Sequence, residues 1–152
     1  MKNTDAMRRI WPPYKLGDKV FVGDSGPEDW LIVRAFQMSR GIGELPKFTY
    51  SLERNYENGN RGVVDNMPEN ELSLHQLAKP GLVHYQFAFW PDQVVKLNHR
   101  NSEGCYRIER IYLYATAANV VRDYKIAPVK QSSMLISEVE LKEKVVKGSR
   151  NA

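Results

Sequence analysis

The chain has very little cysteine, with Cys105 as the single one among 152 residues. One cysteine cannot form an internal disulfide, and this agrees with a reducing compartment. We therefore expect a cytoplasmic protein in which Cys105 is a small buried side chain. No stretch approaches the roughly 18 apolar residues of a membrane span, and the basic start "MKNTDAMRRIWPPY" lacks the apolar run of a secretory signal. These absences predict a soluble protein without a membrane partner.

Residue groups typical of catalysis or metal binding are also scarce. The three histidines, His75, His84 and His99, do not stand at ligand spacing with cysteines or carboxylates. The Gly-x-Gly in "RGIGELPK" lacks the third glycine and the following helix of a phosphate-binding loop, and no Gly-x-Ser-x-Gly occurs. We therefore expect no enzyme activity, no catalytic residue, no metal, no cofactor and no small-molecule substrate.

Positive charge is present, but only in the second half of the chain. Residues 1–80 carry equal numbers of basic and acidic side chains, so the net charge of +4 comes from residues 81–152. The two halves therefore differ electrically, although their patterns of apolar residues are similar.

Two stretches repeat the same succession of segments. The first runs through "LGDKVFV", "WLIVRAF", "FTYSLERN" and "MPENEL", and the second through "WPDQVVKLN", "CYRIERIYLY", "RDYKIAPV" and "ISEVELK". Runs of β-branched residues and period-2 alternation predict strands in both. Matching intervals favour a duplication, and the alternative is a chance similarity between short β patterns. In the duplication, Asp18 aligns with Asp92, and three inward-facing pairs are expected: Val20 with Val94, Val33 with Ile108, and Leu72 with Leu141.

This succession resembles the strands of SH3-like small β-barrels of the KOW and Tudor kind, in which a Gly-Asp-x-Val strand precedes a curved hairpin. The resemblance covers residues 16–75 and 89–142, with Pro91 in place of the glycine in the second copy. It implies an all-β fold of two tandem SH3-like barrels packed together, with a binding role. The expected boundaries are an N-terminal tail 1–13, barrel 14–76, a packed connector 77–88, barrel 89–147 and a C-terminal tail 148–152.

The closing segment of each copy also carries helix signals. Asn66 with Glu69, and Ser137 with Glu140, have the spacing of a capping box. Gly148 would end a short C-terminal helix over "LKEKVVKG". The second segment alternates equally well as a strand, so the sequence leaves both structures open.

Basic side chains replace neutral ones in the second copy, where tyrosines lie between them. Lys and Arg neutralise phosphates while exposed rings stack on unpaired bases, so this composition is typical of a surface that binds RNA or DNA. The alternative is an ordinary solvated face with the tyrosines in the core. The candidate binding residues for a nucleic acid or another partner are Lys96, His99, Arg100, Arg107, Arg110, Tyr114, Arg122 and Lys125.

The first copy suggests a second class of function. Its strands "VFV" and "LIV" are apolar on both faces, so some of their side chains need a cover outside their own core. That cover is either the neighbouring copy or a protein partner, which would make the chain an adaptor, an inhibitor or a structural accessory subunit. The candidate interface residues are Phe21, Ile32 and Trp90.

Overall fold

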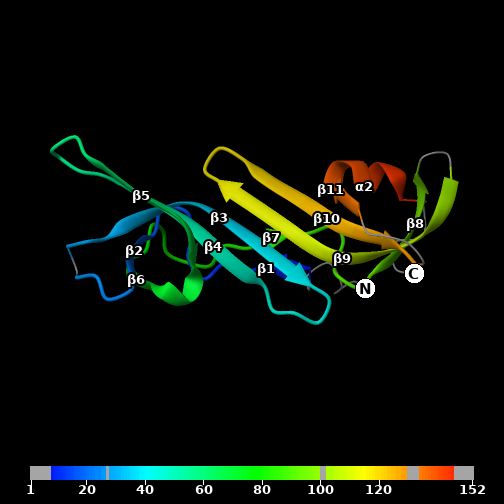
Figure 1. The fold of residues 1–152 in the computed structure, drawn as a ribbon, viewed down its shortest axis with the longest axis horizontal. Helices are drawn as coiled ribbons and strands as arrows, with labels where there is room; N and C mark the ends of the chain where they lie inside the picture. The colour runs from blue at the N-terminus through cyan, green and yellow to red at the C-terminus, as the bar shows by residue number, and fades with distance from the viewer. Residues whose placement is uncertain (1–7, 27, 100–101, 130–133, 146–152) are drawn as a thin grey trace.

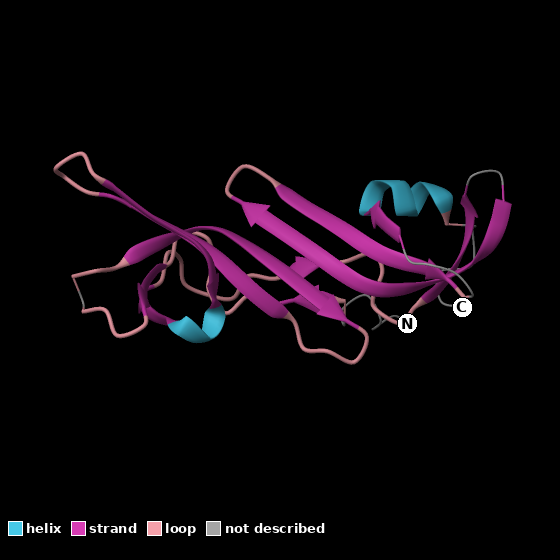
Figure 2. Cartoon of the chain, viewed as in Figure 1, coloured by secondary structure: helices cyan, strands magenta, loops and turns pink. Residues whose placement is uncertain are grey.

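The computed structural model describes residues 8–26, 28–99, 102–129 and 134–145. The regular elements among these residues are strands, one 3-10 turn and one short helix near the C-terminus, which confirms the expected all-β fold (Figure 2). Nine strands form one sheet, and β1 (Arg9–Ile10) pairs with β7 (Tyr85–Gln86) in a separate two-stranded sheet. No helix in the described part of the chain is long and apolar enough to cross a membrane.

The first half contains five strands of the large sheet and the 3-10 turn η1. They are β2 (Lys19–Val22), β3 (Leu31–Gly41), β4 (Lys47–Asn55), β5 (Arg61–Pro68), η1 (Glu69–Glu71) and β6 (Leu72–Gln76). β2, β3, β4 and β5 pair in succession, and β6 returns to pair with β2. Within the described residues the sheet does not close between β5 and β6, so these strands form an open sheet.

The second half follows the same path with a true helix before its last pairing. Its elements are β8 (Val94–His99), β9 (Ser102–Thr116), β10 (Val120–Pro128), β11 (Met134–Ser137) and α2 (Glu138–Lys144). After α2, Val145 forms an antiparallel bridge with Leu97 on β8. The Ser137 hydroxyl accepts the N–H of Glu140 at 3.2 Å, so the helical alternative is the correct one here. The expected end at Gly148 is wrong, because α2 ends at Lys144 and Val145 is its C-cap. The corresponding signal at Asn66 leads only to the single turn η1.

The turn that precedes the first strand is the same in both halves. The Asp18 carboxylate accepts the N–H of Lys15 at 2.8 Å, and the Gln93 side chain accepts the N–H of Trp90 at 3.2 Å. The backbone N–H of Asp18 donates to the Lys15 carbonyl, and that of Gln93 donates to the Trp90 carbonyl, each at 3.1 Å. Asp18 therefore occupies the position of Gln93.

The expected alignment of the two aspartates is wrong by one residue, because backbone conformation decides the register. Gly17 has a φ of +91° and Asp92 a φ of +76°, a left-handed conformation that aspartate adopts more readily than most residues. The equivalent of Val20 is therefore Val95, and both are fully buried. Val94, which the sequence suggested, is only partly buried.

A buried tyrosine takes the same role in each half. The hydroxyl of Tyr50 accepts the N–H of Tyr14, and the hydroxyl of Tyr124 accepts the N–H of Phe89, both at 3.3 Å. The ring pairs are edge-to-face, with centroids 5.5 and 5.7 Å apart. Tyr50 and Tyr124, which the sequence patterns align, are both fully buried.

The expected equivalence of Leu72 and Leu141 is wrong, although both are buried. Leu72 begins β6 and pairs with Val22, whereas Leu141 lies inside α2. The bridge between Val145 and Leu97 is the counterpart of the Leu72–Val22 pair. The second half has the helix α2 where the first half has the single turn η1. Leu141 therefore belongs to the helix, whereas Leu72 belongs to the strand that follows the turn.

The two halves are joined by backbone hydrogen bonding along a seam, defined as residues 35–41 of β3 paired antiparallel with residues 110–116 of β9 (Figure 1). Met38 lies opposite Leu113 at its centre. These two residues are equivalent in the repeat, so a pseudo-two-fold axis passes between them. The halves thus share one continuous sheet, and the exact limits of the two proposed barrels remain predictions.

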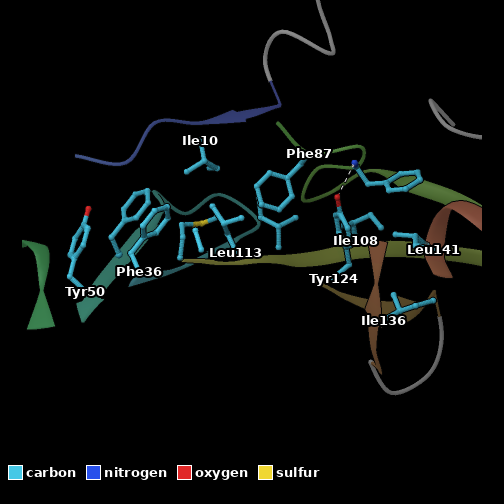
Figure 3. Close-up of a cluster of buried hydrophobic side chains, with 14 of the residues drawn as sticks. Ile10, Phe36, Tyr50, Phe87, Ile108, Leu113, Tyr124, Ile136 and Leu141 are labelled. Carbon is cyan, nitrogen blue, oxygen red and sulfur yellow. Dashed lines mark hydrogen bonds between the residues drawn. The ribbon is translucent and has the colours of Figure 1, made fainter. Parts of the chain in front are cut away.

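One hydrophobic core extends through both halves (Figure 3). It includes Phe87 from the connector and Phe89 from the start of the second half, and burial of each such side chain contributes about 1.5–3 kcal/mol. Ile10, which lies in the segment expected to be a tail, is also buried there. The expected tail residues 1–7 and 148–152 lie outside the described residues.

Hydrogen bonds join the connector to the first half. The buried Asp18 carboxylate accepts the N–H of Ala78 at 2.8 Å. The Lys15 ammonium group donates to the carbonyls of Lys79 and Gly81. These bonds satisfy two charged side chains that are almost fully buried, as such groups require.

Candidate functional site

The outer face of the sheet at the seam brings together side chains from both halves. Along β9, Ile111, Leu113 and Ala115 are buried, so Tyr112 and Tyr114 between them point outward. The strand register then arranges outward residues of β4, β3, β9 and β10 in three rows. The first row is Thr49–Gln37–Tyr114–Val121, and the second row is Lys47–Ser39–Tyr112–Asp123. The third row is Gly41–Arg110–Lys125. Lys125 also lies opposite Leu135 of β11.

The first two rows line an open groove of about 430 Å³, the seam groove. Its floor includes Met38 and Leu113, so it lies on the pseudo-two-fold axis. The side from the first half is polar, whereas the side from the second half presents two tyrosines. Tyr114 is 42% exposed. Two residues apart on one strand, the rings stand roughly 7 Å from each other.

Arg110 lies at one end of the seam groove and is held by an acid from the first half. Its Nη2 atom is 2.7 Å from Oε2 of Glu44, which lies in the β3–β4 loop. This hydrogen bond holds the pKa of the Glu44 carboxyl below its ordinary value. A Cβ atom on Gly41 would lie 2.7 Å from the Arg110 Nη2 atom, so glycine makes room for the guanidinium group.

Three other predicted bases have separate surroundings. Arg107 forms an ion pair with Asp92 at 2.6 Å, and both side chains are largely exposed. Arg122 on β10 donates from Nε to the Gln86 carbonyl at 2.8 Å and lies over the Phe87 ring. These contacts join β10 to β7. Lys96 is exposed on β8. Arg107 continues the line of Arg110, whereas Lys96 and Arg122 do not lie in the rows of the seam.

The structure thus groups three of the predicted residues, Arg110, Tyr114 and Lys125, beside the seam groove. His99 ends β8, but its side chain lies outside the described residues, as does Arg100. Sequence reasoning did not select Tyr112, Lys47 or Gln37. Tyr112 could have been found from its alternation with buried neighbours, whereas Lys47 and Gln37 become part of the site only through pairing across the seam.

The predicted protein-interface residues are partly covered within the chain. The Phe21 ring lies edge-on against His75, with centroids 4.8 Å apart, and Ile32 is half-buried. Trp90 lies under the guanidinium of Arg40 at 4.7 Å, which is a contact between the two halves.

Cys105 is exposed on β9, so the expectation that it is buried is wrong. It lies on the solvent side because the buried neighbours of β9 are Tyr106 and Ile108.

Within the described ranges, no group of three histidine, cysteine, aspartate or glutamate side chains could hold a metal ion. Comparison of the chain with protein-family models, curated proteins and solved structures found no match.

Proposed function

We propose that the chain is a non-enzymatic, cytoplasmic binding protein that holds single-stranded RNA or DNA across the outer face of the seam. The observation that carries this proposal is the pair of outward tyrosines, Tyr112 and Tyr114, in a groove flanked by Lys47, Arg110 and Lys125. Each ring can stack on one unpaired base, which contributes about 1–3 kcal/mol per base. The flanking bases supply phosphate contacts whose strength depends on salt.

The ion pairs of this face are compatible with binding to phosphate. The Arg107–Asp92 pair is solvent-exposed, and the Arg110–Glu44 pair is partly so. Exposed ion pairs contribute only about 0–1 kcal/mol, so exchanging a carboxylate for a phosphate costs little. Phosphate also accepts the same paired hydrogen bonds from a guanidinium group.

The first test removes the stacking surface. Changing both tyrosines, Tyr112→Leu and Tyr114→Leu, is expected to weaken binding of a short single-stranded oligonucleotide by at least about tenfold, because base stacking is lost. Fluorescence anisotropy at about 50 mM salt measures the effect, since phosphate contacts are strong at low salt. Tyr56→Leu, at the tip of the β4–β5 hairpin, is the matched control and should leave affinity unchanged.

The salt dependence of the affinity distinguishes binding through phosphate contacts from binding through apolar contacts alone. The variant Lys47→Gln/Lys125→Gln should flatten the plot of log affinity against log salt by roughly 0.7 per lost phosphate contact. These lysines are better targets than Arg110, whose removal would also break a contact across the seam. A wild-type protein with no salt-dependent affinity for any single strand would contradict the proposal.

The Glu44 carboxylate should compete with a phosphate group of the oligonucleotide for Arg110. This carboxylate occupies Arg110 and, because the pKa of Glu44 is lowered, it is ionised at neutral pH. Glu44→Gln is therefore expected to raise affinity for the oligonucleotide several-fold by anisotropy. Glu53→Gln is the control, since it releases Arg61 on the hairpin, away from the seam groove. Equal affinities of Glu44→Gln and the wild type would show that the ion pair does not compete.

A second candidate function, docking of a protein partner as an adaptor, inhibitor or accessory subunit, is favoured by one observation. Apolar side chains remain exposed on β6 and along the connector, with Leu82 86% exposed and Leu74 and Leu77 about half exposed. Capture of partners from the source cells, with and without nuclease, distinguishes the two functions. Nuclease-resistant capture lost in Leu82→Ser would support docking of a protein.

A further inference from the structure

The β4–β5 hairpin extends beyond the sheet at the end of the molecule opposite to α2 (Figure 1). A second hollow is lined by residues of this hairpin and by Trp30. Arg54 near the end of β4 sits here with its guanidinium carbon 3.8 Å from the ring centroid of Trp30 and 4.6 Å from that of Tyr56. Lys19 lies over the Trp30 ring as well, at 4.2 Å. Two aromatic rings therefore hold the guanidinium group in a defined position.

Hydrogen bonds fix the orientation of this guanidinium group. Its Nη1 atom donates to the carbonyl of Glu28 at 2.7 Å and to that of Trp30 at 3.3 Å. Its Nε and Nη2 atoms have no hydrogen-bond partner within the described part of the chain. These two atoms form the edge that binds a carboxylate through two parallel hydrogen bonds. Arg54 is thus held in place with its recognition edge unused.

Three arginines of the sheet, Arg61, Arg107 and Arg110, form ion pairs with carboxylates of the same chain. Arg40 and Arg122 instead donate to backbone carbonyls. Arg61 is 3.0 Å from Glu53, and the two arginines near the seam are paired at comparable distances. Acids stand next to Arg54 in the sequence, in Glu53 and Glu57, yet neither forms an ion pair with it in the described structure. Its free edge is therefore not explained by a lack of acids nearby.

The space in front of Arg54 is large enough for a ligand. A hollow of about 610 Å³ is lined by Trp30, Arg54, Asn55, Tyr56, Glu57 and Asn58. This volume lies within the range of small-ligand sites. The Asn58 side-chain oxygen accepts the N–H of Asn60 at 3.0 Å, so its amide nitrogen is the end available to a ligand. The hollow thus combines two aromatic walls with fixed hydrogen-bond donors.

We propose that this hollow binds a monoanionic carboxylate, through two parallel hydrogen bonds from Nε and Nη2 of Arg54. The faces of Trp30 and Tyr56 contact the Arg54 guanidinium group, so the edges of these rings contact the apolar part of the ligand. The ligand is a free organic acid or the carboxylate end of a peptide, which offer the same chemistry. This site is separate from the seam groove, and its existence does not depend on binding of nucleic acid.

The surrounding charges favour one negative charge over two. Lys19 lies over the Trp30 ring, but four acids outnumber it. Glu57 lines the hollow, and Asp24, Glu28 and Asp29 are exposed on the preceding β2–β3 loop. Each acid repels a dianionic phosphate more strongly than a carboxylate. A flat carboxylate also matches the planar fork of a guanidinium group whose faces are occupied by rings.

The full chain can be tested by nuclear magnetic resonance, following the Arg54 Nε–H and Trp30 indole N–H signals. Benzoate and N-acetylphenylalanine are expected to shift both signals saturably. N-acetylphenylalanine amide, which has the same ring without the carboxylate, should not. A peptide with a free C-terminus, compared with its amidated form, shows whether a peptide end is accepted. Inorganic phosphate should bind at least about tenfold more weakly, because of the neighbouring acids.

Variants then test the paired hydrogen-bond donors of Arg54. Arg54→Lys keeps the charge but loses the paired donors, so affinity for N-acetylphenylalanine should fall at least about tenfold. Arg34→Lys, on the exposed side of β3, is the matched control and should bind as the wild type does. The acid–amide comparison needs no substitution, so a folding defect in Arg54→Lys cannot obscure the result. Equal shifts by acid and amide, no saturable shift, or equal binding of phosphate would each overturn the proposal.

Discussion

Residues 1–79 expressed alone are expected to form no soluble, folded monomer. Removal of the second half leaves the seam edge of β3 without a partner over residues 35–41. It also uncovers Phe36 and Met38, which are buried in the intact chain. Loss of about 1.5–3 kcal/mol for each large apolar side chain is a substantial part of a total stability of about 5–15 kcal/mol.

Size-exclusion chromatography and thermal melting of the fragment measure this result, with the intact chain as control. Pairing of the free β3 edge with a second copy of the fragment is geometrically allowed by the pseudo-two-fold axis. In such a pair, Arg40 would lie near Lys15, the equivalent of Trp90, and would lose its aromatic contact. We therefore expect aggregation. A soluble monomer that melts at the midpoint of the intact chain would show that the seam is not required.

Stability is also expected to fall steeply above about pH 10, where tyrosines ionise in the unfolded chain. Burial raises the pKa of Tyr50 and Tyr124 far above that value, and a hydrogen bond donated to Glu138 raises the pKa of Tyr124 further. Both stay neutral in the folded protein while the unfolded chain loses protons. The stabilisation is thus complete below pH 10 and lost as pH rises, by about 1.4 kcal/mol per pH unit for each tyrosine.

Urea unfolding between about pH 8 and pH 11.5 measures this dependence, since the slope reports the difference in bound protons. Absorbance of tyrosinate near 295 nm shows which rings ionise before unfolding. Tyr124→Phe should lower the slope by about 1.4 kcal/mol per pH unit, the contribution of one tyrosine. It also costs about 1–3 kcal/mol because the Phe89 N–H loses its acceptor. Ionisation of all tyrosines near pH 10 in the folded state would rule out this explanation.

Local patterns in the sequence predicted most of the strand order. Alternation in "FTYSLERN" and "RDYKIAPV" aligned Tyr50 with Tyr124, and the structure buries both. The register error at the first strand arose because the shared Asp-x-Val letters aligned two aspartates. The structure aligns Gly17 with Asp92 instead, because both adopt positive φ, and no side-chain pattern reveals that conformation.

The site was less predictable because it is made by contacts between distant parts of the chain. Arg110 reads as a free base in the sequence, but Glu44 pairs with it across the seam. The one sequence signal for the seam was strand length. β3 has 11 residues and β9 has 15, against a usual 5–6, and the surplus of each strand pairs with that of the other.

The unequal lining of the seam groove gives it a direction. A groove on a true two-fold axis between identical copies presents the same side chains when turned end for end, so it cannot distinguish the two ends of a bound chain. Here Gln37 and Ser39 face Tyr114 and Tyr112 across the axis. Fusion of the two copies into one polypeptide lets each side vary separately, and a polymer with distinct ends would then bind in a single polarity.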